Sequence, residues 1–220
     1  MASDDRRPRR VYRVLCGGEP GVGKTSVVRR LTNNYFPKTD PSAKQDQSVG
    51  ISYQFKKMRL KGETILLQVW DAERVDSEIV GDMSSTDHHL SRVRGAAIIL
   101  DVMQLKHLDK YLRKRVEAIK EQNGANDATE MCIVLLVNKT DLVEKIHKAD
   151  MKHLDKAVKE FQLCGWFEVS ALDGTNVDVA YQHLAIRMMD ADDYTTMEPS
   201  EQCNVLPGTG GAAWEFCACS

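Results

Sequence analysis

Eight consecutive residues near the start of the chain have the types and the spacing that bind a phosphate. Gly18–Thr25 matches the pattern G-x-x-x-x-G-K-[ST] at every required position. The glycines let backbone N–H groups approach a phosphate closely, Lys24 neutralises β- and γ-phosphate charge, and the Thr25 hydroxyl is a ligand for Mg²⁺. The alternative is a glycine-rich turn that binds nothing. We predict a nucleotide site, to which this loop contributes Glu19, Pro20, Gly21, Val22, Gly23, Lys24, Thr25 and Ser26.

A second polar segment, Asn138-Lys139-Thr140-Asp141, indicates which base is bound. A carboxylate at Asp141 can accept hydrogen bonds from both the ring N–H and the exocyclic amino group of guanine. Adenine has no such pair of donors, and the desolvated carboxylate would be left unpaired. Lys139 is expected to cover the base and approach the phosphate loop. The residues predicted to contact guanine are Asn138, Lys139 and Asp141, together with the segment Ser170, Ala171 and Leu172 after the next strand.

The elements that must position these residues alternate between strand-like and helical patterns. The runs 95–101 and 131–137 are almost continuously hydrophobic, as in strands that are covered on both faces. A helix with apolar residues at helical spacing over 105–119 connects them. Further strands are expected at 11–16, 49–59, 64–70 and 165–170, and further helices from 26 and over 177–189.

The sum of these patterns is an α/β fold with a doubly wound, mostly parallel six-stranded sheet and one antiparallel edge strand, contributed by the hairpin over 49–70. Ligands of such sheets bind at the carboxyl ends of the strands, where both polar segments fall.

The 220 residues suffice for one domain with two tails. We expect a basic arm over 1–10, the globular domain over 11–190 and a flexible tail over 191–220. A net charge of −2 gives no electrostatic case for nucleic-acid binding. There is no secretory signal and no apolar run long enough to cross a bilayer, and six dispersed cysteines suggest reduced thiols in the cytosol.

These motifs resemble those of the Rab branch of the small GTPases, over residues 11–190 and again at the C-terminus. Ser48–Tyr53 is similar to the family's switch I sequence T-[IV]-G-I-D-F, and Leu67–Asp71 is similar to the L-Q-[IV]-W-D that enters switch II. Tyr12–Leu15, Glu19 and Gly165–Glu168 resemble the Rab subgroup that serves lysosome-related organelles. The resemblance implies the P-loop G-domain fold.

The resemblance also implies roles for particular residues and partners. It implies GTP/GDP and Mg²⁺ as ligands, with the metal held by Thr25, Ser48 and, through water, Asp71. Tyr53 and Trp70 would belong to an aromatic surface that effectors read, or would simply pack in the core. The expected partners are a guanine-nucleotide exchange factor, a GTPase-activating protein, effector proteins, and a GDP-dissociation inhibitor or Rab escort protein. The expected role is a nucleotide-dependent switch in vesicle and membrane trafficking.

The chain departs from the family in switch II. Where the family has W-D-T-A-G-Q-E, this chain has W-D-A-E-R-V-D over 70–76, without the glycine or the glutamine that orients the attacking water. Pro20 also removes one N–H donor from the phosphate loop. We therefore expect slow hydrolysis of GTP, assisted by Lys24 and Thr25. The alternative is a non-hydrolysing scaffold that holds GTP permanently; a P-loop kinase is weaker, because N-K-x-D has no role there.

The last residues carry two thiols that suggest a lipid anchor. Cys217 and Cys219 flank one residue, as in the double prenylation sites of Rabs, and Cys217 also heads a C-a-a-X box that ends in serine. Two lipid chains anchor a protein stably, whereas one is marginal. An unmodified tail is the alternative. The expected location is the cytosolic face of an intracellular membrane.

Overall fold

The computed structural model describes residues 8, 10–36, 53–71, 93–122 and 131–196. In this part of the chain a single six-stranded sheet has the order β2-β3-β1-β4-β5-β6. β2 runs antiparallel to β3, and the other neighbouring pairs are parallel. The α/β fold class expected from the sequence is confirmed.

The strands are β1 (Arg10–Gly18), β2 (Tyr53–Leu60), β3 (Glu63–Asp71), β4 (Val93–Asp101), β5 (Cys132–Asn138) and β6 (Gly165–Glu168). The helices are α1 (Lys24–Asn33), α4 (Leu108–Gln122), α5 (Lys148–Glu160) and α6 (Val177–Thr196), with the short 3-10 helices η2 (Val102–His107) and η3 (Thr140–Leu142). α5, η2 and η3 were not expected from the sequence. None of the helices in the described ranges combines the length and apolar composition needed to span a membrane.

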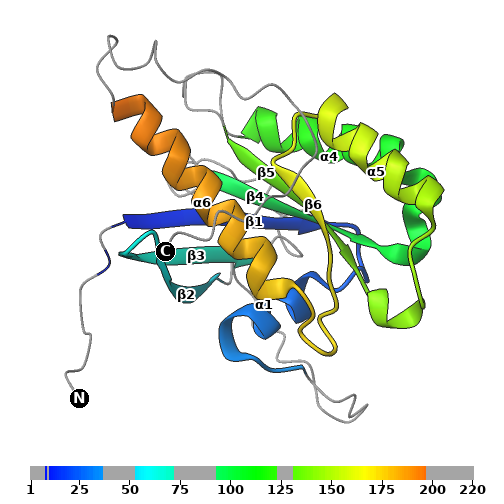
Figure 1. Ribbon diagram of the computed structural model, residues 1–220, viewed down its shortest axis with the longest axis horizontal. Helices are drawn as coiled ribbons and strands as arrows, with labels where there is room; N and C mark the ends of the chain where they lie inside the picture. Colours follow the sequence, from blue (N-terminus) through cyan, green and yellow to red (C-terminus); the bar gives the residue numbers. More distant parts are fainter. Residues whose placement is uncertain (1–7, 9, 37–52, 72–92, 123–130, 197–220) are drawn as a thin grey trace, which may run out of the picture.

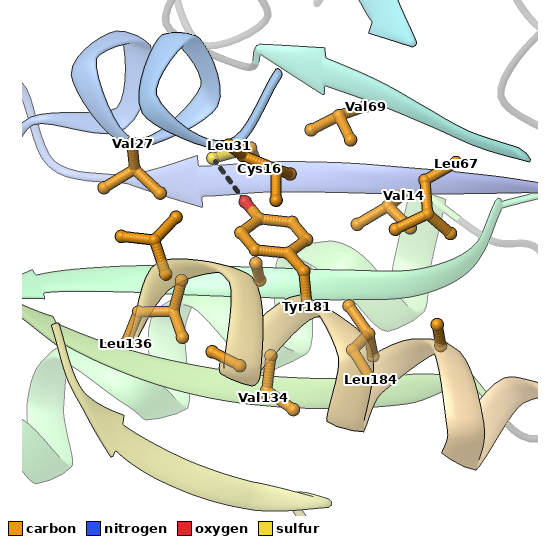
Figure 2. Packing of buried hydrophobic residues seen from close by; sticks show 14 of the residues in the cluster. Val14, Cys16, Val27, Leu31, Leu67, Val69, Val134, Leu136, Tyr181 and Leu184 are labelled. Atoms are coloured by element: carbon orange, nitrogen blue, oxygen red, sulfur yellow. Dashed lines mark hydrogen bonds between the residues drawn. The ribbon is translucent and has the colours of Figure 1, made fainter. Parts of the chain in front are cut away.

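The sheet has a hydrophobic core on each face, because alternate side chains of a strand point to opposite sides. On β5, Val134 and Leu136 join the core beneath α1 and α6, whereas Ile133 and Leu135 join the core beneath α4 and α5. This explains why β4 and β5 are apolar at nearly every position. Figure 2 shows the first core, in which the hydroxyl of the fully buried Tyr181 lies 3.7 Å from the sulfur of Cys16.

The last helix is longer than its hydrophobic pattern predicted: a helix was expected over 177–189, and α6 spans Val177–Thr196. α6 continues to Thr196 because its polar end is held by side chains from the sheet. Asp190 pairs with Lys61 of the β2–β3 turn, and Asp192 pairs with Arg94 of β4.

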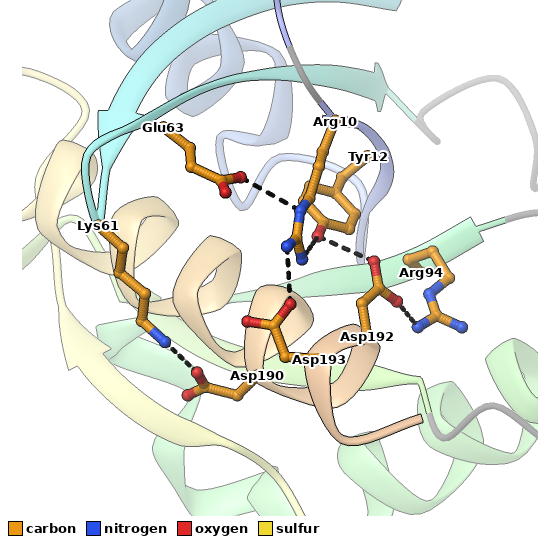
Figure 3. A network of polar contacts seen from close by, with 8 residues as sticks. All are labelled: Arg10, Tyr12, Lys61, Glu63, Arg94, Asp190, Asp192 and Asp193. Carbon is orange, nitrogen blue, oxygen red and sulfur yellow. Dashed lines mark hydrogen bonds and ion pairs between the residues drawn. The ribbon is translucent and has the colours of Figure 1, made fainter. Parts of the chain in front are cut away.

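Arg10 also differs from expectation. Instead of ending a solvated arm, it begins β1, and its guanidinium lies 2.7 Å from Asp193 and 3.3 Å from Glu63 (Figure 3). The Tyr12 hydroxyl donates to Asp192 at 2.9 Å. Ion pairs of this partly exposed kind contribute about 1 kcal/mol or less each, so the order of the helix end depends on their number. The structure of residues 197–220, where the flexible tail is expected, lies outside the described residues.

Candidate nucleotide site

The predicted site residues that the structure describes come together at one edge of the sheet. This edge contains the carboxyl ends of the five parallel strands, with Gly18 of β1 and Asp71 of β3 on one side and Asn138 of β5 on the other. In the sheet β1 lies between β3 and β4: the next strands of the chain, β2 and β3, lie on one side of it, and the later strands β4, β5 and β6 lie on the other. Such a switch point is where open α/β sheets bind their ligands.

The phosphate loop connects β1 directly to α1, and the backbone conformation of Gly23 determines where the helix begins. Gly23 has a φ of 97°, a left-handed conformation that disfavours other residues, and a Cβ there would lie 2.5 Å from the Asn138 side-chain nitrogen. The helix therefore begins at Lys24, two residues earlier than its pattern predicted. Backbone N–H groups of its first turn have no partner within the helix, which makes this end favourable for an anion.

Lys24 is buried beneath the loop, with 2% of its surface exposed. Its ammonium group donates to the carbonyl oxygens of Gly18 at 2.9 Å and Glu19 at 3.0 Å. These bonds place a positive charge inside the loop in a site of low solvent access, where it attracts a phosphate more strongly than it would in water.

Thr25 and Asp71, the residues that the resemblance assigns to Mg²⁺, lie next to each other. The Thr25 hydroxyl donates to Oδ2 of Asp71 at 2.6 Å, which brings a hydroxyl and a carboxylate oxygen together beside the start of α1. Mg²⁺ prefers oxygen ligands and usually takes one or two from the protein, with the rest from phosphates and water. The pair therefore fits such an ion, which would neutralise phosphate charge there.

Asn138 joins three segments of the site and is buried, with 1% of its surface exposed. Its amide nitrogen donates to the Val22 carbonyl at 2.8 Å, and its amide oxygen accepts from the backbone N–H of Ala171 at 3.1 Å. One side chain thus connects the phosphate loop, the end of β5 and the segment after β6.

Lys139 makes a second connection between the two motifs. Its ammonium group donates to the Gly21 carbonyl at 2.8 Å and lies 2.7 Å from the carboxylate of Asp101 at the end of β4. The approach of Lys139 to the phosphate loop, expected from the sequence, is therefore present in the geometry.

Asp141 lies in η3 with one carboxylate oxygen held by Ser170. The Ser170 hydroxyl donates to Oδ1 of Asp141 at 2.6 Å, which orients the carboxylate. β6 ends at Glu168, two residues before the predicted end, and the segment Ser170–Leu172 turns across this edge of the sheet. Arg30 of α1 holds that segment through the carbonyls of Ala171, at 2.9 Å, and Leu172. Asp141 and the segment Ser170–Leu172, both predicted to contact guanine, are thus neighbours.

A sequence model of the Ras family matches residues 13–190, which is most of the chain and includes all the residues of the nucleotide site described in the preceding paragraphs. The chain belongs to the Ras family. Membership implies guanine-nucleotide binding and GTPase chemistry, in agreement with the paired loops.

Individual relatives place this Ras-family protein in the Rab branch, as predicted. It is 26% identical over 192 residues to Ras-related protein Rab-32A of Dictyostelium discoideum, covering 87% of the chain and 84% of the relative. It is 28% identical over 180 residues to Ras-related protein Rab-32 of Mus musculus, covering 81% and 76%. It is 24% identical over 202 residues to Ras-related protein RABA2b of Arabidopsis thaliana, covering 92% and 87%.

The two aromatic residues of the expected effector surface have different environments in this small GTPase. Trp70 is 6% exposed and packs in the core beneath α4, whereas Tyr53 is 46% exposed. Their rings are 5.0 Å apart. Ser48, the switch II departure over 72–76, and the thiols Cys217 and Cys219 lie outside the described residues.

Several residues that shape the site of this GTPase were not predicted. Asp101, Thr140, Arg30 and Tyr111 all hold a loop of the site through side-chain hydrogen bonds or ion pairs. A signal existed for Asp101, because it is a polar residue directly after the apolar run of β4. Thr140 lies within the predicted guanine motif, at its variable position, and nothing local distinguishes Arg30 and Tyr111 from ordinary polar residues.

Replacing Asn138 with alanine should loosen both loops of the GTPase. The Val22 carbonyl and the Ala171 N–H would lose their buried partner, so we expect a loss of about 2–4 kcal/mol in the free energy of unfolding. Urea denaturation of the nucleotide-free protein measures this loss. As a control, Asn176→Asp keeps a side chain that tolerates the left-handed φ of 54° and removes the exposed amide that donates to the Glu168 carbonyl at 2.9 Å, so it should cost about 1 kcal/mol or less. Equal losses in the two variants would contradict the bridging role.

Proposed function

We propose that this protein is a Rab-type switch that binds GTP and GDP with Mg²⁺ and controls a step of intracellular membrane trafficking. The observation that carries the proposal is the direct bonding of the phosphate loop to the guanine motif by Asn138 and Lys139. One ligand that spans a phosphate group and a base fits both loops at once. GTP would order the segments around Ser48 and 71–90 through γ-phosphate and Mg²⁺ contacts, and GDP would release them.

Nucleotide binding is tested by extracting and chromatographing the nucleotide from purified protein, followed by titration with guanine and adenine nucleotides in Mg²⁺. We expect co-purified GDP or GTP and a strong preference for guanine. Equal affinity for adenine nucleotides would refute the proposal. A predominance of GTP over GDP would show that hydrolysis in the cell is slow relative to nucleotide exchange.

Slow hydrolysis follows from the switch II sequence. In single-turnover assays with bound GTP, we expect the natural protein to hydrolyse GTP at least ~10-fold more slowly than a variant with the family sequence. That variant carries Ala72→Thr, Glu73→Ala, Arg74→Gly, Val75→Gln and Asp76→Glu. The restored glutamine would orient the attacking water. Equal rates in the two proteins would show that the missing residues do not limit catalysis.

A non-hydrolysing scaffold is the second candidate, favoured by the same departure from the family sequence. Such a protein would hold GTP and present one permanent surface to its partners. A single-turnover rate equal to that of GTP in buffer would select this candidate over the switch. In either case the partners are effector proteins, and the switch additionally needs an exchange factor and a GTPase-activating protein.

Membrane attachment is proposed through prenylation of Cys217, Cys219 or both. Mass spectrometry of the protein isolated from cells measures the number of lipids directly. We expect Cys217→Ser with Cys219→Ser to shift the protein from the membrane fraction to the soluble fraction, because the lipid supplies most of the membrane affinity. An unchanged distribution would contradict the anchor. A Rab escort protein or GDP-dissociation inhibitor would then have no lipid to bind.

A further inference from the structure

A buried phenol hydroxyl connects α4 to the first residues of the phosphate loop. Tyr111 is 8% exposed, and its hydroxyl donates to the carbonyl oxygen of Ile99 at 2.6 Å. The same hydroxyl accepts from the backbone N–H of Glu19 at 3.2 Å. Burial raises the pKa of Tyr111 to about 12, so the hydroxyl keeps its proton at neutral pH. It therefore bridges the end of β4 and the start of the loop.

The fit around this hydroxyl is close. A Cβ on Gly18 would lie 2.6 Å from the Ile99 carbonyl oxygen and 3.2 Å from the Tyr111 hydroxyl, so glycine is required there by space. Arg115 lies one helical turn after Tyr111, on the same face of α4. Its guanidinium is 3.4 Å from the carboxylate of Glu19. α4 thus holds Glu19 by its backbone and by its side chain.

Lys24 also contacts Glu19, together with the preceding residue Gly18. Its ammonium group donates to the carbonyl oxygens of Gly18 and Glu19. Because Lys24 is buried, the position of its ammonium group depends on where those two carbonyls lie. The carbonyls in turn belong to the backbone that Tyr111 holds. A displacement of Glu19 would therefore be transmitted to Lys24.

We propose that Tyr111, assisted by Arg115, is a positioning residue that sets where Lys24 meets the β- and γ-phosphates. Tyr111 touches the loop and acts through Lys24, so its effect should be confined to the phosphates that Lys24 reaches. The inference rests on the nucleotide-binding function proposed above. It adds a residue of α4 to a site whose recognised motifs lie in the loops.

The test compares GDP with GMP, which lacks the β-phosphate. Tyr111→Phe keeps the ring and removes the hydroxyl. We expect its affinity for GDP to fall about tenfold, and its affinity for GMP to change by less than about twofold. Isothermal titration of nucleotide-free protein in Mg²⁺ measures both constants. A purely structural role would weaken both ligands equally.

Tyr12→Phe is the matched control. Tyr12 is also buried, and its hydroxyl is hydrogen bonded to Asp192 at the opposite end of β1 (Figure 3). The Tyr12→Phe variant loses a buried tyrosine hydroxyl, as Tyr111→Phe does, but far from the loop. Its ratio of the GMP dissociation constant to the GDP dissociation constant should therefore equal that of the natural protein. Arg115→Gln leaves the Tyr111 hydroxyl in place and should lower that ratio about threefold. It serves as the test if Tyr111→Phe does not fold.

The outcomes separate this inference from the proposed function. If the natural protein binds no guanine nucleotide, the proposed function fails, and the inference fails with it. If the natural protein binds GDP, but Tyr111→Phe and Arg115→Gln have the same ratio of GMP to GDP dissociation constants as the natural protein, only the positioning role is overturned. The positioning role is supported if the ratio of GMP to GDP dissociation constants is lowered in both variants and is unchanged in Tyr12→Phe. In a Lys24→Ala background, Tyr111→Phe should then have no further effect on GDP affinity.

Discussion

Replacing Lys24 with alanine is expected to weaken binding of GTP and GDP at least ~100-fold, equivalent to about 2.8 kcal/mol. The ammonium group lies in the loop with 2% of the residue exposed, so water cannot substitute for it. Hydrogen bonds to a charged group contribute about 1.5–3 kcal/mol, and this group would serve two phosphates. Fluorescence titration with a labelled GDP measures the loss.

Lys156→Ala is the control for this prediction. Lys156 is an exposed residue of α5, so its removal takes away the same charge without touching the loop. Its affinity for GDP should equal that of the natural protein. A Lys24→Ala variant that is folded by circular dichroism and still binds GDP with natural affinity would exclude the loop as the phosphate site.

Replacing Asp141 with asparagine should change which base is bound. Guanine presents two N–H donors to the carboxylate, and an amide would offer one acceptor and one donor in its place. We expect GTP affinity to fall at least ~100-fold, because a site built for a donor pair rejects a mismatch strongly. Xanthosine triphosphate carries a carbonyl where guanine has its amino group, so it should bind the variant better than GTP does.

Competition of GTP, xanthosine triphosphate and ATP against a labelled nucleotide measures this reversal. Asp155→Asn is the control, since Asp155 is an exposed carboxylate of α5 that also accepts a side-chain hydrogen bond, from Trp166 at 2.8 Å. It should keep the natural preference for GTP. An unchanged preference in Asp141→Asn would show that another group reads the base. Loss of phosphate affinity in one variant and reversal of base choice in the other would define the two halves of the site.

Motifs of contiguous residues were predictable from the sequence because their function depends on local backbone geometry. The spacing of Gly18, Gly23 and Lys24 is set by a single turn between a strand and a helix, and each lies where the pattern requires. The alternation of buried runs and helical patterns determined the α/β class, because a strand covered on both faces must be apolar throughout. The base-reading role of Asp141 is a prediction that rests on hydrogen-bond chemistry alone.

Element ends were less predictable, because partners from distant segments decide them. The pattern of α6 loses its apolar face near Asp190, yet the helix continues because Lys61, Arg94 and Arg10 reach its acidic end. Conversely, β6 ends early, since Ser170 turns to bind Asp141.

The sequence by itself determined the family, the fold class and the two loops in which we predict the nucleotide to bind. Only the tertiary structure decided how the helices hold these loops in place. Tyr111 reaches Glu19 across 92 positions of the chain, and Arg30 reaches Ala171 across 141. Such bonds depend on how α4 and α1 pack against the sheet, and packing brings together residues that no local pattern relates.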